Sequence, residues 1–245
     1  MPHETPNPNE ATHAPNVVPS SLDRDLAKLR RRVVRSANVS IDMLEASLHA
    51  LWTVDHEVAG EVRLRDDQVD NEEVEIEREC LRLLTLQRPY GQDFRLITFC
   101  LKANADIERV ADHATSIAKV TQKLDPVCPP KWPTALSELG DRVPVLCQTL
   151  LRAVLDEDVS VARSLVDGDR VIDTLDQQLF NEITAWIERE PSKGDTALNL
   201  YRLGRELERV GDLMANIAED VVYLVTGEII RHQKQRRPRR LAEGA

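Results

Sequence analysis

Two pairs of carboxylates, 100 residues apart in the chain, have the spacing and chemistry of a divalent-cation site. Glu108 and Asp112 are spaced i, i+4, and so are Glu208 and Asp212. On a helix this spacing puts both side chains on one face, one turn apart. Carboxylates that converge from neighbouring helices repel one another, and a hard or borderline divalent metal would relieve that repulsion.

A second acidic pattern precedes each pair, with the spacing i, i+4, i+7 that also marks a single helical face. These stripes are Asp66, Asp70 and Glu73 in the first half, and Asp169, Asp173 and Asp176 in the second. If the helices that carry a stripe and a pair are antiparallel neighbours, the carboxylates face each other. The alternative is that the stripes are solvated helix surfaces, with Arg109 and Arg209 forming ordinary ion pairs to Asp112 and Asp212.

His113, beside Asp112, is the histidine nearest these carboxylates, and the equivalent position in the second half is Leu213. A di-iron oxidase built in a helical bundle would need Glu-x-x-His pairs. The sequence has one, Glu10 and His13, within a proline-rich N-terminal segment. It has no P-loop, G-x-S-x-G or H-E-x-x-H motif. We therefore predict no catalytic residues and no enzymatic activity, with a metal-dependent bundle enzyme and a metal-free helical scaffold as the alternatives.

Apolar residues at three- and four-residue steps predict six helices and an all-α fold. The predicted ranges are 22–52, 55–86, 92–123, 134–155, 159–190 and 196–225. Pro144 predicts a kink or a restart in the fourth helix, and Gly227 a C-terminus after the sixth. No alternating strand pattern competes, so the sequence predicts two tandem three-helix bundles.

The second half of the chain repeats the first. Residues 107–112 (IERVAD) match residues 207–212 (LERVGD), and the region of Asp70 matches that of Asp173. Such self-similarity indicates an internal duplication. The predicted domains are a tail at 1–20, bundles at 21–125 and 134–228, a proline-rich linker at 126–133 and a basic tail at 229–245.

Composition narrows the class of protein. The 245 residues are 30% charged and 42% hydrophobic, which is typical of a globular chain, and only 4% aromatic, which disfavours β-sandwiches and barrels. The net charge is −10, and residues 231–245 oppose six Lys and Arg to one acid. An acidic body argues against nucleic acid as a partner. The basic tail has the charge to contact an anionic membrane or an acidic partner, or to serve only as a solvated tail.

The sequence predicts neither secretion nor a membrane-spanning segment. No apolar run approaches the roughly 20 residues needed to span a bilayer, and the N-terminus has no apolar signal core. Four cysteines, Cys80, Cys100, Cys128 and Cys147, are widely spaced. This spacing favours reduced, buried thiols in a cytoplasmic protein over disulfides or a zinc ribbon.

The doubled motif resembles the PhoU family, the bacterial accessory proteins of phosphate transport and phosphate signalling. The resemblance covers about residues 22–228, and it is carried by residues 92–95, 106–114, 117–118, 206–212, 216–219 and 223–228, with the middle-helix aspartates. It implies two similar three-helix bundles in a non-enzymatic protein. It also implies a cytoplasmic homodimer that restrains phosphate uptake and the phosphate-starvation response when phosphate is ample. The partners it implies are the ATPase subunit of the phosphate ABC transporter and a phosphate-sensing histidine kinase, with membrane contact only through them.

The resemblance also implies metal binding, by Fe, Zn, Mn or Mg ions, through the doubled acidic motif. The expected ligands are Glu108, Asp112, Glu208 and Asp212, supported from the facing helices by Asp70, Glu73, Asp173 and Asp176; further candidates are His113, Asp66, Asp169 and Asn216. The chain departs from the family pattern where Ala111 replaces a glycine, Ser116 an asparagine and Leu213 a histidine. The two sites are therefore expected to differ in occupancy or in metal preference.

Overall fold

The computed structural model describes residues 20–230, except for the side chains of 167–169, so most of both predicted tails lies outside the described residues. Within this range the chain is helical, which confirms the predicted all-α class. The helices are α1 (Ser21–Thr53), α2 (His56–Gln87), α3 (Gly91–Thr121), α4 (Thr134–Asp156), α5 (Val159–Arg189) and α6 (Gly194–Thr226), with a 3-10 turn, η1 (Pro191–Lys193), between the last two. None of the helices in the described range is long and apolar enough to span a membrane.

The helix bounds agree with the periodicity to within two residues at most ends, and Gly227 ends α6 in a left-handed conformation with φ 75°. The predicted restart at Pro144 is wrong, because α4 runs through this residue. An internal proline costs a helix about 3 kcal/mol. The buried face of α4, which includes Leu139, Val143 and Leu150, offsets that cost.

The turn between the first and second helices has the same backbone conformation in both halves. Val54 and Glu157 both adopt left-handed backbone conformations, with φ 50° and 53°. Asp55 and Asp158, which follow them, accept hydrogen bonds from the first free backbone N–H groups of α2 and α5. Such N-caps contribute about 1 kcal/mol each. The sequence duplication therefore extends to the backbone conformation of the turns.

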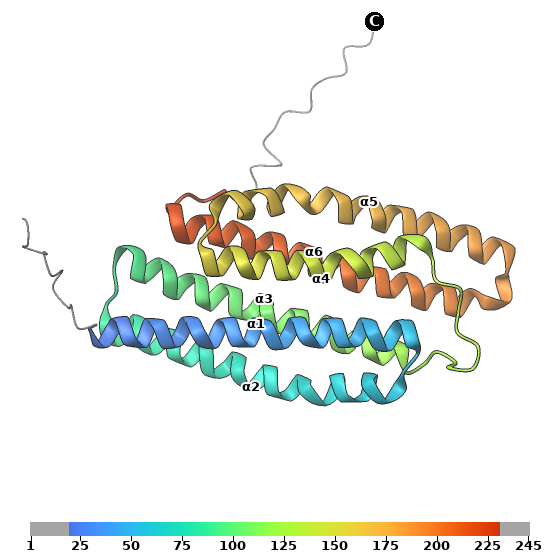
Figure 1. Ribbon diagram of the computed structural model, residues 1–245, viewed down its shortest axis with the longest axis horizontal. Coiled ribbons are helices and arrows are strands. Elements are labelled where there is room, and N and C mark those ends of the chain that lie inside the picture. The colour runs from blue at the N-terminus through green and yellow to red at the C-terminus, as the bar shows by residue number, and fades with distance from the viewer. Residues whose placement is uncertain (1–19, 231–245) are drawn as a thin grey trace, which may run out of the picture.

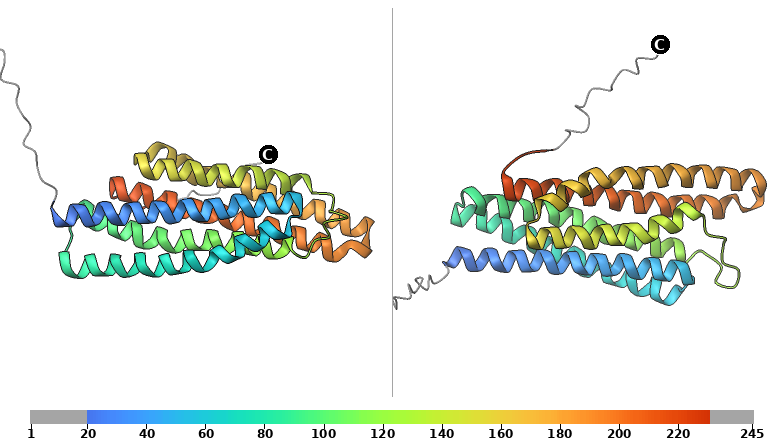
Figure 2. Two further views of the ribbon diagram at one scale, coloured as in Figure 1. Left: turned by 60° about the horizontal axis from the view of Figure 1, so that its bottom comes forward. Right: turned by 45° about the horizontal axis from the view of Figure 1, so that its top comes forward.

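The two bundles lie side by side along their length (Figures 1 and 2). The first contains α1, α2 and α3, and the second contains α4, α5 and α6. They meet where α3 packs against α6 and α1 against α4. Buried apolar residues from all six helices form one continuous core.

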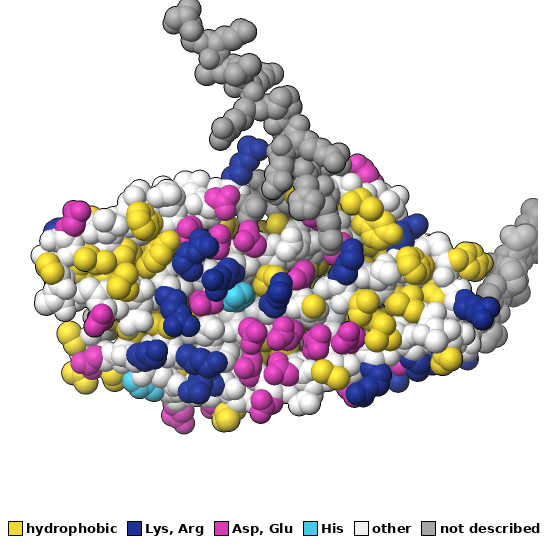
Figure 3. Space-filling model, turned by 180° about the vertical axis from the view of Figure 1, so that it is seen from behind, with side chains coloured by type: hydrophobic (Ala, Val, Ile, Leu, Met, Phe, Trp, Pro, Cys, Tyr) yellow, Lys and Arg dark blue, Asp and Glu magenta, His cyan; other side chains and the backbone are white. Residues whose placement is uncertain are grey.

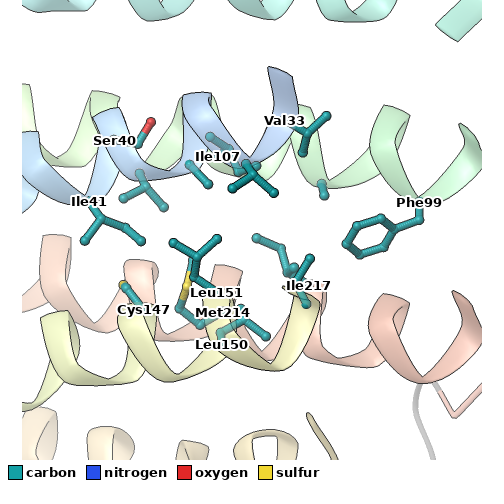
Figure 4. Close-up of a pocket in the computed structure, with 15 residues that line it drawn as sticks. Val33, Ser40, Ile41, Phe99, Ile107, Cys147, Leu150, Leu151, Met214 and Ile217 are labelled. Atoms are coloured by element: carbon teal, nitrogen blue, oxygen red, sulfur yellow. The ribbon is translucent and has the colours of Figure 1, made fainter. Parts of the chain in front are cut away.

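A small apolar cavity of about 40 Å³ lies between the bundles, lined by side chains such as Val33, Phe99, Leu151 and Ile217 (Figure 4). Ser40 is the polar exception in its lining, and its buried Oγ has no hydrogen-bond partner among the described residues. A lining with a single polar atom does not favour water, which needs two to four polar partners.

The segment between α3 and α4 is anchored to the first bundle. Trp132 packs edge-on against Trp52 of α1, with 5.1 Å between the ring centroids. Such aromatic pairs contribute about 0.5–1.5 kcal/mol beyond the area they bury. The connection therefore takes part in the packing of the fold.

Three of the four cysteines are buried as predicted, but Cys128 in the connecting segment is exposed, and all four are free thiols. Burial raises the pKa of the Cys147 thiol to about 12, which keeps it protonated and unreactive at neutral pH.

Candidate metal centres and the groove between them

The first carboxylate site lies between α2 and α3. Glu108 on α3 is half-buried, and its pKa is raised to about 7, chiefly by burial and further by the negative charges of Asp112, Asp70 and Glu73. These mutual effects require the acidic stripe of α2 to face the acidic pair of α3. The predicted juxtaposition is therefore present in the first bundle.

Asp66 and Glu73 complete this site on α2. Burial raises the pKa of both carboxyl groups, and Asp70 adds repulsion to each. Thr115 Oγ1 partly relieves Asp66 by donating a 3.0 Å hydrogen bond to its Oδ1. Asp70 and Asp112 are more exposed, so the site has a half-buried floor and a solvated rim.

The second carboxylate site, between α5 and α6, contains an internal cation. Arg205 Nη1 lies 3.0 Å from Asp176 Oδ2 and 3.2 Å from Glu208 Oε1. Burial raises the pKa of Glu208, as do Asp212, Asp176 and Asp173, while Arg205 opposes the rise. The second oxygens, Asp176 Oδ1 and Glu208 Oε2, are buried and have no hydrogen-bond partner among the described residues.

Arg205 distinguishes the two sites, and it was not predicted from the sequence. The equivalent position in the first half is Ala105, which is exposed. The alignment of the two halves contains this difference, but only the structure shows that the guanidinium reaches the carboxylates. The side chain of Asp169, a further candidate of the second site, lies outside the described part of the chain.

His113 is engaged away from the carboxylate site. Its Nδ1 lies 2.7 Å from Glu206 Oε2, and this contact joins α3 to α6. Burial alone would raise the pKa of Glu206, but the hydrogen bond and charge of His113, with Arg209 and Arg202 nearby, hold it below its usual value. Only Nε2 of His113 remains for another ligand. Glu206 is a second residue that sequence reasoning missed, because its role depends on how the bundles meet.

A groove of about 440 Å³ lies between the two carboxylate sites, along the contact of α3 and α6. It is lined by both motif arginines and both motif aspartates with three neighbours: Arg109, Asp112, His113, Arg209, Asp212, Leu213 and Asn216. The predicted candidate Asn216 thus lines this groove. Figure 3 shows Lys, Arg and a His side chain on this face of the molecule, with acidic side chains on both sides of them.

The side chains of the first carboxylate site have donor atoms suited to a divalent cation. They are all oxygen donors and they repel one another, and the positive charge of Arg109 only partly opposes the rise in the pKa of Glu108. Their arrangement is open, since the described side chains include no group of three or more His, Cys, Asp or Glu already close enough to hold a metal ion. A cation would therefore have to draw the carboxylates together by side-chain rotation.

Fold and site together define a class of protein: a duplicated three-helix bundle in which each half carries a Glu-x-x-x-Asp pair beside an acidic helix. The PhoU domain model matches residues 33–121 and 136–221. The chain belongs to the PhoU family.

Curated relatives agree over most of the chain. A Deinococcus radiodurans protein named phosphate-specific transport system accessory protein PhoU homolog is 34% identical over 207 residues, which is 84% of this chain and 97% of that protein. A Pseudomonas aeruginosa protein of the same name is 29% identical and covers 92% of this chain and 93% of its own length.

Solved structures confirm the fold. The crystal structure of PhoU from Pseudomonas aeruginosa superposes with a TM-score of 0.81 at 29% identity, and the match covers 84% of this chain and 100% of that one. The phosphate transport system regulatory protein PhoU from Streptococcus pneumoniae gives a TM-score of 0.79 at 28% identity, with 85% and 99% covered. These comparisons confirm the family and the pair of three-helix bundles expected from the sequence.

Proposed function

We propose that this protein is a non-enzymatic regulator of a phosphate-specific transport system, which restrains phosphate uptake when phosphate is ample. The observation that carries the proposal is the family match over both halves, with relatives named as accessory proteins of that system. The retention of both acidic pairs supports it.

The proposed partners are the ATPase subunit of the phosphate ABC transporter and a phosphate-sensing histidine kinase. We place the protein in the cytoplasm as a homodimer that reaches the membrane through these partners. The absence of a membrane-spanning helix within residues 20–230 is compatible with this role.

The role is tested by deleting the gene and measuring phosphate uptake and an alkaline phosphatase reporter in cells grown with ample phosphate. Both should rise, and the intact gene should restore control. Unchanged uptake and reporter activity, in a strain without a second gene of this family, would contradict the proposed role.

We propose further that the first carboxylate site binds a divalent cation through Glu108, Asp112, Asp70 and Glu73, with Asp66 in support. The donor set is all oxygen, which favours Mg²⁺ or Mn²⁺ over Zn²⁺. A bound cation would supply positive charge that offsets the mutual repulsion of these carboxylates. In the second site the guanidinium of Arg205 takes that role towards Asp176 and Glu208, so we expect weaker metal binding there, with Asp173 and Asp212 as the remaining candidates.

Removing the arginine from the second site, or introducing one at the equivalent position of the first site, tests this assignment. Arg205→Ala should create a second strong site and raise the bound Mn²⁺ per chain by about one. Ala105→Arg, at an exposed position, should remove the first. Bound metal is measured by equilibrium dialysis and elemental analysis, with circular dichroism to confirm that each variant is folded. Equal metal content in the wild type and both folded variants would show that Arg205 does not set the difference.

A further inference from the structure

The groove between the carboxylate sites brings together equivalent residues of the two halves. Arg109 and Arg209 are related by the offset of 100, as are Asp112 and Asp212, and all four line the groove. Because α3 and α6 each contribute the arginine and the aspartate of the motif, the groove lies where its two copies meet. A ligand bound there would contact both bundles.

The two arginines are only loosely held by their own helices. Their side chains are 64% and 56% exposed, and the closest ion-pair contacts are 3.8 Å from Arg109 Nη1 to Asp106 and 3.9 Å from Arg209 Nη1 to Glu206. These distances exceed those of a hydrogen bond. Turning either guanidinium towards a ligand therefore breaks only a weak ion-pair contact.

We propose that this groove binds inorganic phosphate, with Arg109 and Arg209 as its charge partners. A guanidinium presents N–H donors in a planar fork that matches two oxygens of a tetrahedral oxyanion. Two such forks from neighbouring helices can hold one phosphate between them. The amide of Asn216, which also lines the groove, offers a further N–H donor.

The two aspartates favour phosphate over sulfate. Phosphate keeps at least one proton near neutral pH, so it can donate an O–H hydrogen bond to a carboxylate of Asp112 or Asp212. Sulfate carries no proton under these conditions and meets only repulsion there. A lining that mixes arginine and aspartate therefore selects a protonated oxyanion.

Phosphate binding is coupled to metal binding because Asp112 belongs to both the groove and the first carboxylate site. A divalent cation on that site offsets the negative charge that faces the phosphate. Such coupling is reciprocal, so phosphate must strengthen cation binding by the same factor. This step rests on the proposed metal site, whereas the arginine contacts do not.

The test is equilibrium dialysis of the full-length protein against radiolabelled inorganic phosphate, with and without Mg²⁺. Arg109→Gln/Arg209→Gln should weaken phosphate binding at least tenfold, while its Mg²⁺ content, measured without phosphate, should not fall. The matched control is Arg78→Gln/Arg142→Gln. These arginines are similarly exposed, at 67% and 55%, and each pairs with a glutamate of its own helix outside the groove. The control should bind phosphate like the wild type.

Competitors establish the identity of the ligand. Unlabelled phosphate should displace the label, whereas sulfate and AMP should not do so at tenfold higher concentration. Equal competition by AMP would assign the groove to phosphate esters and overturn the assignment to free phosphate. Phosphate binding that survives in the Arg109→Gln/Arg209→Gln variant would place the anion elsewhere, on the metal or another surface, and would also overturn it.

The outcomes separate this inference from the proposed function. If Mg²⁺ binds and phosphate does not, the groove assignment fails while the regulatory role, tested by uptake, is unaffected. If phosphate binds through the arginines with equal affinity in the presence and absence of Mg²⁺, the anion site stands and the coupling fails. We expect Mg²⁺ to improve the affinity about five- to tenfold.

Discussion

Ionisation of Glu108 destabilises the folded protein whenever the first carboxylate site lacks a cation. The folded-state pKa of about 7 lies above the ordinary value of 4.5. The folded protein therefore holds the proton more tightly than the unfolded chain, and stability falls as the pH rises from about 4.5 to about 7. Above pH 7 the full penalty applies.

Replacing Glu108 with Gln should remove this penalty. In metal-free buffer at pH 8 we expect Glu108→Gln to be more stable than the wild type by about 1–2 kcal/mol, a figure discounted because the site is partly solvated. At pH 4.5 the difference should vanish. Urea denaturation at both pH values measures it, with the exposed Glu188→Gln as the control. A stability gain of the same size at both pH values would show that charge is not its cause.

Residue types and spacing were enough to predict the carboxylates of the first site, because helical geometry alone puts i, i+4 side chains on one face. They were not enough to predict which side chains neutralise them. Arg205 and Glu206 each act on a partner that is distant in sequence or across the bundle contact, and their pairing depends on helix rotation and on distances of a few ångströms. The alternative interpretation paired the motif arginines with Asp112 and Asp212, whereas Arg109 and Arg209 contact the carboxylates three residues before them, Asp106 and Glu206.

The helices themselves were predictable because apolar periodicity and helix ends are local signals. How closely the helices approach was not predictable, and Gly204 of α6 marks one close approach. A Cβ at Gly204 would lie 2.0 Å from Leu179 Cδ2 of α5, whereas a Cβ at Gly194 would meet nothing within 4 Å. Gly204 therefore marks a place where α6 approaches α5 too closely for a larger side chain.

Gly204→Ala should destabilise the protein. Overpacking against the fully buried Leu179 costs about 1–3 kcal/mol, and the better helix propensity of alanine returns at most about 1 kcal/mol. Gly194→Ala is the control, and it should be neutral or slightly stabilising because its environment is open. The free energies of unfolding in urea give both values. Equal stability of the two variants would contradict the close α5–α6 approach.

At the scale of the whole molecule, the feature that the sequence did not reveal is the way the two bundles meet. The duplication predicts equivalent halves, yet the contact between α3 and α6 includes an unequal pair. His113 binds Glu206, while the equivalent positions in the opposite halves hold Leu213 and Asp106. Only one side of the bundle contact therefore has this polar link.

A double-mutant cycle measures the contribution of that link. His113→Leu leaves Glu206, which is 5% exposed, without its closest partner, and should cost about 2 kcal/mol because Arg209 and Arg202 compensate in part. Adding Glu206→Leu should recover at least half of this loss, since an apolar pair replaces a buried polar pair at little cost. Additive losses in the double variant would show that the two residues do not interact.

The shared core of the two bundles also bears on the ancestry of the chain. Each half places apolar side chains of its first and third helices against the other half, so a half on its own would expose that surface to water. A second copy of the same half would cover it with two-fold symmetry. The present contact, third helix to third helix and first to first, thus has the form of an interface between two copies of one half. Arg205 and His113, whose equivalents are Ala105 and Leu213, are the places where the two halves depart from that symmetry.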